Sequence, residues 1–372
     1  MKSSLIVSLV ALAFASSAQA EFQYRVPMGM DFSPQAAQES APIGLSGIQC
    51  GIYHCLGVKN GTAWSVGRGD DGRLGLGDVD YRSVWTDTGL PADSVGAGSH
   101  HSFAIKDGEV FAVGPNNYGQ LGLGYDGGFL KEFVSTGFTA SYISGGDRFS
   151  LAISNGKVYG AGAQRGTGLP TNSYNFADTG LSAESIAVGT YHSFAINNGN
   201  LYVTGEGSYG RMGTGSGTDA PSWVDLGISV DAVSAGHAHS LILKDGTVWS
   251  TGEGAYGRTG HGDNGDRTVF TDTGFRASAI ISGHVNSYAI QDGVVYSAGA
   301  TSNSALVLNG EGYTSSEGFK STGQAADSLE GAGFQFLYIM NDGAVLAGGN
   351  GDYGKLGQGA IQDSSVFLEM TQ

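Results

Sequence analysis

Short runs of alternating apolar and polar residues recur along most of this chain, and each run predicts a half-buried β-strand. HSFAI (101–105) and EVFAV (109–113) are one pair of such runs, on either side of the dipeptide Asp107-Gly108. Asn-Gly or Asp-Gly between two strand-like runs is a strong hairpin signal, because the tight turn requires positive φ. The same turn occurs seven times, beginning at Asn60, Asp107, Asn155, Asn198, Asp245, Asp292 and Asp342. Its spacing of 43 to 50 residues predicts seven copies of one unit, as in the blades of a β-propeller.

Further columns of residues run in register with these turns. Glycine stands nine residues before and seven residues after every turn, which indicates a backbone requirement repeated once per unit. A column of aromatic residues lies between successive turns, at Trp85, Phe133, Phe176, Trp223, Phe270, Phe319 and Phe367. The chain between each turn and the following aromatic varies in length. Variable loops on a rigid scaffold usually carry the binding function.

The two ends of the repeat array make a prediction about ring closure. Residues 365–370 contain the last aromatic of the column, Phe367, and no turn follows them. No aromatic strand precedes the first turn, at Asn60. We therefore expect the C-terminal strand to complete the first blade and join the two ends, because a closed ring leaves no open sheet edge.

The first 42 residues lack the repeat. Residues 1–20 combine a positive start, a short apolar stretch and a final Ala-Gln-Ala, which predicts a signal peptide. The mature protein is therefore expected to begin near Glu21 and to be exported, either to the periplasm or to the medium. The proline-containing residues 21–42 predict an extended N-terminal leader ahead of a propeller spanning residues 43–372. No later apolar run is long enough to cross a bilayer, so membrane insertion is not expected.

The chain contains two cysteines, Cys50 and Cys55. In an exported protein a disulfide between them is the leading interpretation, and the alternative is two inert thiols. The other repeats hold mostly small residues at the same two positions, for example Ala97 and Ser102. This indicates that the two sites face each other closely, so a disulfide would pin the first blade.

Segments 94–124 (SVGAGSHHSFAIKDGEVFAVGPNNYGQLGLG) and 233–262 (VSAGHAHSLILKDGTVWSTGEGAYGRTGHG) resemble the regulator of chromosome condensation repeat. That repeat runs roughly as A-G-x-x-H-S-x-A-L-x-x-x-G-x-V-Y-x-W-G-x-N-x-x-G-Q-L-G-x-G. The resemblance covers residues 43–372 and implies an all-β fold, a seven-bladed β-propeller with four-stranded antiparallel blades. The third and sixth copies depart from the pattern, with GAQRGTGLP and GATSNSALVLNG, so altered loops are expected there. Secreted bacterial members such as the propeller-type β-lactamase inhibitor are nearest in compartment, and they bind a protein through one face of the ring.

The main binding candidates lie eleven residues after each turn, in the middle of the variable loop. This column reads Asp71, Tyr118, Gly166, Tyr209, Tyr256, Asn303 and Tyr353. Tyrosine offers a large contact area at low entropic cost, so the four tyrosines are expected to anchor a partner. Their polar neighbours in the expected site are Asp71, Asn303, Glu206 and Glu253. The alternative is that each ring covers nearby glycines and stabilises its own loop.

Metal and enzyme motifs are weak in this sequence. His237 and His239 could form a metal pair on one strand face. His239 nevertheless belongs to a column, six residues before the turn, that holds phenylalanine in two copies and is a scaffold position in the family, so a structural role is expected. The acidic stretches at 70–72 and 263–266 match calcium loops only in part. No metal or cofactor is therefore expected.

These observations favour a monomeric, exported, non-enzymatic module that binds another extracytoplasmic protein, as an inhibitor or an adaptor. Beyond the signal peptide, 34 acidic side chains outnumber 17 basic ones, which favours a basic patch on the partner and disfavours nucleic acid. A carbohydrate-binding propeller is the alternative. An enzyme is the third interpretation and predicts a deep central pocket, although the usual hydrolase and phosphate-binding motifs are missing. A purely structural role in an envelope or particle is also open.

Overall fold

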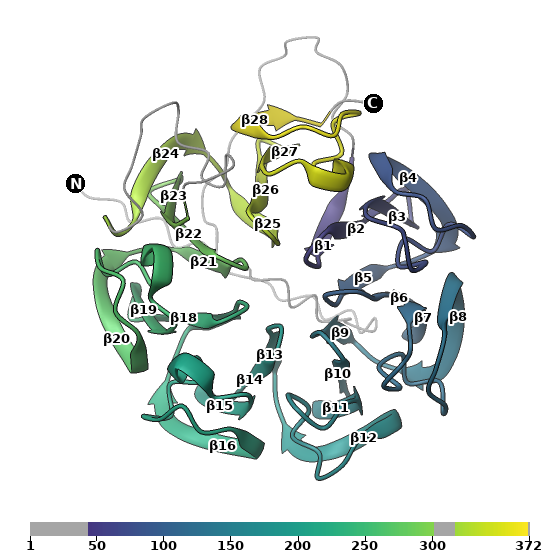
Figure 1. The fold of residues 1–372 in the computed structure, drawn as a ribbon, viewed down its shortest axis with the longest axis horizontal. Helices are drawn as coiled ribbons and strands as arrows, with labels where there is room; N and C mark the ends of the chain where they lie inside the picture. The colour runs from purple at the N-terminus through teal and green to yellow at the C-terminus, as the bar shows by residue number, and fades with distance from the viewer. Residues whose placement is uncertain (1–43, 301–316, 371–372) are drawn as a thin grey trace, which may run out of the picture.

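The computed structural model describes residues 44–300 and 317–370. The predicted signal peptide, the predicted leader and Asn303 therefore lie outside the described residues. Within them, seven four-stranded antiparallel sheets follow one another in chain order around a ring (Figure 1). This arrangement confirms the predicted all-β, seven-bladed propeller.

Each blade is one continuous stretch of chain, with its first strand innermost. Blade 1 contains β1 (Ser46–Cys50), β2 (His54–Lys59), β3 (Thr62–Gly67) and β4 (Arg82–Pro91). Blade 2 contains β5 (Ser94–Ala97), β6 (Ser102–Lys106), β7 (Glu109–Pro115) and β8 (Phe129–Thr139). Blade 3 contains β9 (Tyr142–Gly145), β10 (Phe149–Ser154), β11 (Lys157–Gly162) and β12 (Ser173–Ser182). Blade 4 contains β13 (Ser185–Val188), β14 (His192–Asn197), β15 (Asn200–Gly205) and β16 (Ala220–Ser229).

The remaining blades repeat this order. Blade 5 contains β17 (Ala232–Ala235), β18 (His239–Lys244), β19 (Thr247–Gly252) and β20 (Arg267–Arg276). Blade 6 contains β21 (Ala279–Ser282), β22 (Asn286–Gln291), β23 (Val294–Gly299) and β24 (Lys320–Ala325). Blade 7 contains β25 (Ser328–Ala332), β26 (Phe336–Asn341), β27 (Ala344–Gly349) and β28 (Ser364–Glu369). In the described part of the chain, no helix is long and apolar enough to cross a membrane.

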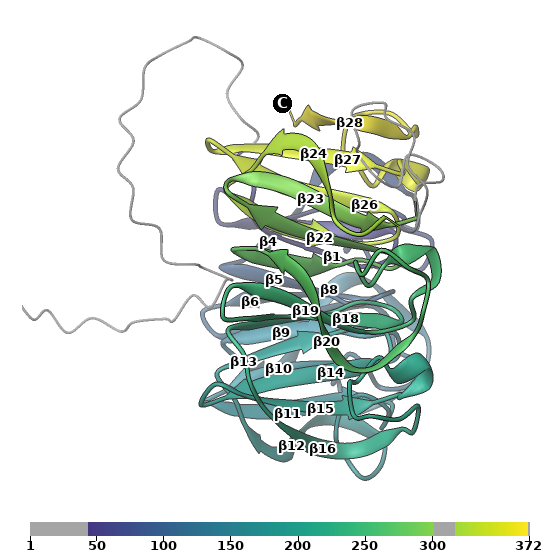
Figure 2. The same cartoon turned by 90° about the vertical axis from the view of Figure 1, so that its left-hand side faces the viewer.

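The seven predicted turns join the second and third strands of each blade. Their Asn or Asp residues all have positive φ, between 49° and 53°, as the tight turn requires. Because the blades are antiparallel, these turns all lie on one side of the ring, which we call the turn face. The loops between third and fourth strands lie on the opposite side, which we call the loop face. Figure 2 shows this separation edge-on.

The predicted ring closure is wrong. The C-terminal strand β28 pairs with β27 of its own blade, for example at Ala347 opposite Leu368, and not with the first blade. Each aromatic of this column lies in the outer strand of the blade whose turn precedes it, or directly before that strand in the case of Phe319, so no strand is left over at the C-terminus. The ring closes instead where β1 and β25 pack side by side. There the N–H of Phe334 donates to the carbonyl of Ile52 at 3.1 Å.

The aromatic column shows why no shared strand is needed. Six of these seven rings lie against a glycine in the loop of the preceding blade, and the ring of Trp85 in blade 1 lies against Gly357 in blade 7. A side chain at Gly357 would come within 2.6 Å of the Trp85 ring. Trp85 and Tyr338 belong to one buried apolar cluster that spans the first and last blades. The closing interface therefore repeats the packing of the other interfaces.

Four buried histidines link neighbouring blades, which supports their expected scaffold role. Each Nε2 atom is hydrogen-bonded to a serine hydroxyl of the next blade, in the pairs His54–Ser102 (2.9 Å), His101–Ser150 (2.7 Å), His192–Ser240 (2.6 Å) and His239–Ser287 (2.8 Å). Each serine then donates to a backbone carbonyl in the loop of the histidine's own blade, at 2.6 to 2.8 Å. Burial holds the pKa of all four histidines well below the usual value, to about 3 for His101. We call this arrangement the histidine relay.

The relay is missing at three of the seven interfaces. Phe149, Asn286 and Phe336 replace the histidine there. The hydroxyl of Ser193, which Phe149 leaves without its histidine, is buried and has no hydrogen-bond partner among the described residues. At the closing interface Phe336 faces blade 1, where Cys55 takes the place of the serine. Apolar packing thus replaces the polar link where the two ends of the array meet.

The predicted disulfide between Cys50 and Cys55 is confirmed. It joins the directly opposed ends of β1 and β2. Cys55 is fully buried, and Cys50 lies against Gly331 of β25, in the last blade. The disulfide therefore supports both the first blade and the strand that closes the ring.

Reduction of this disulfide is expected to lower the free energy of unfolding by about 2 kcal/mol, because even a short covalent loop restricts the unfolded chain. Urea denaturation with and without a reductant measures the loss. A Cys50→Ser/Cys55→Ser variant should match the reduced protein and should not respond to reductant. Equal stability of the oxidised and reduced forms would show that the disulfide is dispensable.

Candidate functional site

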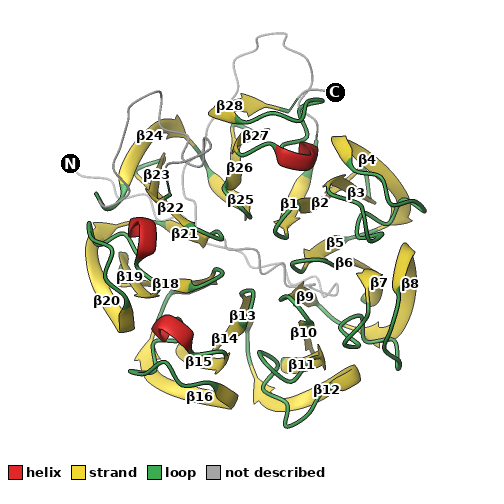
Figure 3. Ribbon diagram, in the orientation of Figure 1, coloured by secondary structure: helices red, strands yellow, loops and turns green. Residues whose placement is uncertain are grey.

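Three of the four candidate tyrosines share one backbone structure on the loop face. In blades 4, 5 and 7 the loop after the third strand forms a 3-10 turn, η1 (Ser208–Gly210), η2 (Ala255–Gly257) and η3 (Asp352–Gly354) (Figure 3). The central residue of each turn is a candidate tyrosine, with φ of 60° at Tyr209, 62° at Tyr256 and 61° at Tyr353. A left-handed backbone costs a residue with a bulky side chain about 1–2 kcal/mol.

The same column in blade 3 shows that the fold does not require tyrosine at this position. Gly166 stands there with φ of 89°, a conformation that glycine adopts without strain. The three tyrosine side chains are also exposed, Tyr209 by 51%, Tyr256 by 53% and Tyr353 by 37%. Exposed rings held in a costly backbone conformation are what the binding hypothesis requires. Rings packed flat over their loops would have contradicted it.

The three loops are held in place by the same hydrogen bond. A backbone N–H two residues before the tyrosine donates to an aspartate carboxylate near the end of the loop, in the pairs Gly207–Asp219 (3.0 Å), Gly254–Asp266 (2.9 Å) and Gly351–Asp363 (3.0 Å). The N–H after each tyrosine donates back to the carbonyl of that same glycine, at 2.8 to 3.0 Å. These bonds fix the direction in which each tyrosine leaves the loop.

Buried cations lie beneath the tyrosines. The guanidinium of Arg211 is 5.8 Å from the ring centroid of Tyr209, and that of Arg258 is 5.5 Å from the ring centroid of Tyr256. Both arginines are almost fully buried. Their charges are balanced by Glu206, at 3.4 Å from Arg211, and by Glu253, at 2.8 Å from Arg258. Above these two buried arginines the surface presents tyrosine rings and carboxylates, and in blade 4 the exposed side chain of Arg165 also contacts Glu206.

Blade 7 carries a variant of the same loop. Lys355 replaces the arginine and is fully buried, and its Nζ donates to Oδ1 of Asn350, which replaces the glutamate. Burial lowers the pKa of Lys355 to about 8. The exposed ring of Tyr353 takes its cation from blade 1, where the guanidinium of Arg68 lies 4.9 Å from its centroid. This contact also crosses the interface that closes the ring.

The other candidate residues are not equivalent to these. Tyr118 is half-buried, lacks positive φ and lies 4.7 Å from the guanidinium of Arg148. Asp71 is ion-paired with the buried Arg73, so it stabilises its own loop. Asn303 lies outside the described residues. The structure thus brings Tyr209, Tyr256, Glu206 and Glu253 together on adjacent blades. Tyr118 and Asp71 differ from them in backbone conformation, exposure or pairing.

A row of rings around the centre of the loop face was not predicted from the sequence. They come from the short turns between first and second strands, at Tyr191, His237, His284, Phe334 and Tyr53. Neighbouring ring centroids are 5.2, 3.8, 5.0 and 5.8 Å apart along this row. The pKa of His237 is lowered to about 4 and that of His284 to about 3, chiefly by burial, so both imidazoles are neutral near pH 7. Their shared position, one or two residues before the second strand of each blade, was the signal that the sequence offered.

A second set of exposed aromatics was also missed. Tyr81, Tyr125, Phe129 and Tyr174 lie between the third and fourth strands, or at the start of the fourth, in blades 1 to 3. They do not share one offset from the turn, because the loops there differ in length. These residues therefore form no column in the aligned repeats, and only the folded ring shows that they are exposed together.

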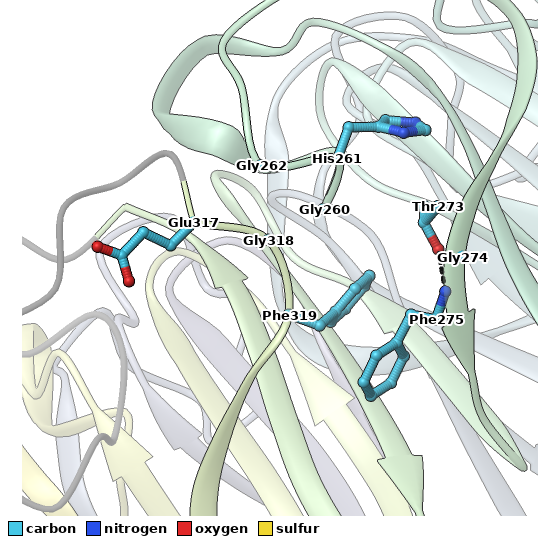
Figure 4. Close-up of a pocket in the computed structure, with 9 residues that line it drawn as sticks. All are labelled: Gly260, His261, Gly262, Thr273, Gly274, Phe275, Glu317, Gly318 and Phe319. Atoms are coloured by element: carbon cyan, nitrogen blue, oxygen red, sulfur yellow. Dashed lines mark hydrogen bonds between the residues drawn. The ribbon is translucent and has the colours of Figure 1, made fainter.

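One surface pocket lies between blades 5 and 6 (Figure 4). Phe275 and Phe319 stack at its base, with ring centroids 4.8 Å apart. His261 is hydrogen-bonded to the hydroxyl of Ser250 at 2.9 Å, and Glu317 points away from it. None of the candidate tyrosines lines this pocket, so it does not join the tyrosine surface.

The possible metal sites are otherwise occupied. His239 belongs to the histidine relay, whereas His237 stacks on His284, so the two histidines do not form a pair. Asp70 is paired with Arg68 at 2.5 Å and Asp263 with Arg267 at 2.7 Å. Within residues 44–300 and 317–370, no group of three or more potential ligands could hold a metal ion.

The fold defines the class of this protein as a seven-bladed β-propeller, and one of its repeats is similar to the regulator of chromosome condensation repeat. Residues 107–153 match the family model described as "Regulator of chromosome condensation (RCC1) repeat". This match confirms the resemblance seen in the sequence. No curated protein sequence matches the chain significantly.

Solved structures share the fold at low sequence identity. The yeast RCC1 protein Prp20, solved bound to Kap60, is 17% identical and has a TM-score of 0.73, over 93% of this chain and 91% of that one. Human WBSCR16 is 18% identical with a TM-score of 0.69, over 83% of this chain and 94% of that one. Prp20p from Saccharomyces cerevisiae, in a structure whose description refers to binding of Gsp1p and histones, is 19% identical with a TM-score of 0.60, over 88% and 77%. These likenesses establish the fold, a propeller like that of RCC1.

Proposed function

We propose that this chain is an exported, non-enzymatic recognition module that binds an extracytoplasmic protein through the loop face of its propeller, as an inhibitor or an adaptor. The proposal combines the predicted signal peptide at residues 1–20 with the exposed tyrosine loops. It is supported by the protein-binding RCC1-like architecture of the yeast neighbour. The fold by itself does not assign a partner, so the loops carry the evidence for binding.

The observation that carries the proposal is the backbone of Tyr209, Tyr256 and Tyr353. Each has a positive φ near 60° and a substantially exposed ring. Glycine would serve the loop at lower conformational cost, as Gly166 does in blade 3. Proteins keep strained residues of this kind mainly at functional sites. Exposed tyrosine is in turn a common anchor of protein interfaces.

The charge around these rings indicates a basic partner patch. Arg211 and Arg258 are buried and paired, whereas Glu206 and Glu253 are only partly covered. The chain as a whole carries a net charge of −16. Opposite charge on the partner would accelerate association and favour correct docking.

The test replaces the three strained tyrosines together, as Tyr209→Gly/Tyr256→Gly/Tyr353→Gly. The free energy of unfolding should stay the same or rise, because glycine relieves about 1–2 kcal/mol of backbone strain at each position before its greater freedom in the unfolded chain is subtracted. Binding of the partner should weaken by at least about 100-fold, since an anchoring tyrosine contributes about 2 kcal/mol or more. Affinity capture from the extracytoplasmic fraction, followed by titration of the recovered protein, measures this loss.

The matched control makes the same kind of replacement on the turn face, as Asn60→Gly/Asp245→Gly/Asp292→Gly. These residues also have positive φ, but they point away from the loop face. The control should recover the same partner as the wild type. Equal recovery by the tyrosine variant, or a loss of several kcal/mol in its stability, would show that the tyrosines serve the scaffold.

A further inference from the structure

We propose that Glu253 and Asp266, beside Tyr256 in blade 5, form a binding site for a guanidinium group, supplied by an arginine side chain of the partner. This inference rests on the proposed function, because it names the chemistry that the loop face would recognise. It goes beyond a general preference for basic partners, since it assigns one side-chain type to one pair of carboxylates. The reason lies in the neighbouring blade.

In blade 4 the equivalent site is already filled by an arginine of the chain itself. Arg165, in the loop of blade 3, reaches across to blade 4, where its Nη1 donates to Oε2 of Glu206 at 2.7 Å. Its Nη2 lies 3.4 Å from Oδ2 of Asp219. The Arg165 side chain is 56% exposed, so it lies on the surface of the loop face and is not part of the core. It shows what an incoming arginine would do.

The blade 5 loop reproduces the blade 4 loop in length and in hydrogen bonding. Glu253 corresponds to Glu206, and Asp266 corresponds to Asp219. The clamp from a glycine N–H to the aspartate measures 2.9 Å in blade 5 and 3.0 Å in blade 4. The buried arginine donates its Nε–H to a loop carbonyl at 2.9 Å in blade 5 and 3.0 Å in blade 4. The two pairs of carboxylates are therefore held in the same way.

Each of the two carboxylates in blade 5 has one paired oxygen and one unpaired oxygen. Oε2 of Glu253 is paired with the buried Arg258, and Oδ1 of Asp266 accepts the N–H of Gly254. Across residues 44–300 and 317–370, no hydrogen bond or ion pair is formed by Oε1 of Glu253 or Oδ2 of Asp266. In blade 4 the corresponding oxygens are the ones that contact Arg165: Oδ2 of Asp219 and the oxygen of Glu206 that does not face Arg211. The two oxygens of a glutamate are chemically equivalent, so their labels can differ between blades.

Among residues 44–300 and 317–370, no arginine corresponding to Arg165 reaches this second site. The residue of blade 4 that corresponds to Arg165 is Ser208, which is short and uncharged. Residues 301–316, which lie outside the described residues, contain neither lysine nor arginine. Arg267 follows Asp266 directly, but its guanidinium is held by Asp263 at 2.7 Å and by the carbonyl of Gly265 at 2.6 Å. Two fixed carboxylates beside an exposed ring are thus available to a cation of a binding partner.

Guanidinium is the cation that this geometry favours. In blade 4 two different nitrogens of one planar group engage two different carboxylates, which a single ammonium nitrogen cannot reproduce. Tyr256 adds an exposed ring three residues from Glu253, and arginine also packs well on aromatic faces. Lysine is therefore expected to bind more weakly than arginine.

The test uses the full-length protein with isotope-labelled tyrosine and the small probe N-acetylarginine methylamide. In the wild type, the ring signals of Tyr256 should shift on titration and those of Tyr209 should not. In Arg165→Ala the blade 4 site is vacated, so both rings should shift. In Glu253→Gln/Asp266→Asn the Tyr256 shift should need at least about tenfold more probe, a difference of about 1.4 kcal/mol. The amides keep an oxygen for Arg258 and for Gly254, so this variant should fold, as its melting temperature will show.

Two results would overturn the inference. One is a Tyr256 signal that does not respond to the probe, or responds equally to uncharged N-acetylnorleucine methylamide. The other is an Arg165→Ala variant in which Tyr209 stays silent, because blade 4 would then not be a guide to blade 5. The proposed function can fail separately. If the partner binds through the tyrosines with the same affinity for Glu253→Gln/Asp266→Asn, the proposed function is supported and the arginine site is wrong. If the probe binds but no partner depends on the tyrosines, only the proposed function is wrong.

Discussion

Lowering the pH from 7 to 5 is expected to reduce the free energy of unfolding by several kcal/mol. The four histidines of the relay are buried and neutral, with pKa values held far below the usual 6.5. In the unfolded chain they regain ordinary pKa values and bind protons. The contribution of these neutral histidines to stability is therefore fully present above about pH 6.5. It is lost as the pH falls below that value, by about 2 kcal/mol per histidine at pH 5. Four such losses are comparable with the whole stability of a typical domain.

Urea denaturation at pH 7, 6 and 5 measures this dependence. The window excludes aspartates with lowered pKa, such as Asp178, whose stabilising charge is lost only below about pH 4. Reduced repulsion within an acidic protein acts in the opposite direction as the pH falls, so the slope is best compared with a variant. His192→Phe copies the residue found in two other blades and should reduce the slope by about one proton, or 1.4 kcal/mol per pH unit. Identical slopes for the two proteins would show that the relay does not titrate on unfolding.

Trp85→Ala is expected to cost about 3–5 kcal/mol, because it removes a large buried ring from the interface that closes the propeller. Trp85 is 5% exposed and packs edge-on against Tyr338 of the last blade, with ring centroids 5.8 Å apart. The cavity would lie where no covalent connection joins the first and last blades. The measurement is the free energy of unfolding in urea, together with the slope of the transition.

The conservative variant Trp85→Phe tests whether the interface requires tryptophan itself or only a large buried ring. Phenylalanine fills this column in four of the first six blades, so Trp85→Phe should keep most of the stability lost in Trp85→Ala. Trp64→Ala, in the same blade, should cost less, because Trp64 is only half-buried. If Trp64→Ala and Trp85→Ala were equally destabilising, the closing interface would contribute no more to stability than the rest of the blade.

The repeated scaffold could be predicted because its signals are local. An Asx-Gly turn needs positive φ wherever it occurs, and all seven turns have it. The disulfide was predictable for a similar reason, since Cys50 and Cys55 lie on opposite sides of a short turn. Ring closure was predicted wrongly because a periodic sequence has no marked beginning. The same columns fit a strand completed by the next blade or by its own, and only the pairing of β28 with β27 decides between them.

The candidate site divides in the same way. Periodicity placed Tyr209, Tyr256 and Tyr353 in one column, but it also placed Tyr118 there, which the fold holds in a different backbone conformation. The reach of Arg165 to Glu206 spans 41 residues and two blades, and no pattern within one repeat could show it. The row of rings from Tyr191 to Tyr53 likewise comes from five blades, and it becomes continuous only when the ring is closed.

The sequence by itself determined the number of blades, the turns, the disulfide and the loops in which the proposed binding residues lie. These features depend on interactions between residues close together in the chain, and each copy repeats them. The tertiary structure decided how the ring closes, which tyrosines are strained and exposed, and which carboxylates are already paired. Those properties depend on contacts between blades, where residues at equivalent positions meet different neighbours. Identical columns therefore acquire different chemistry around one ring.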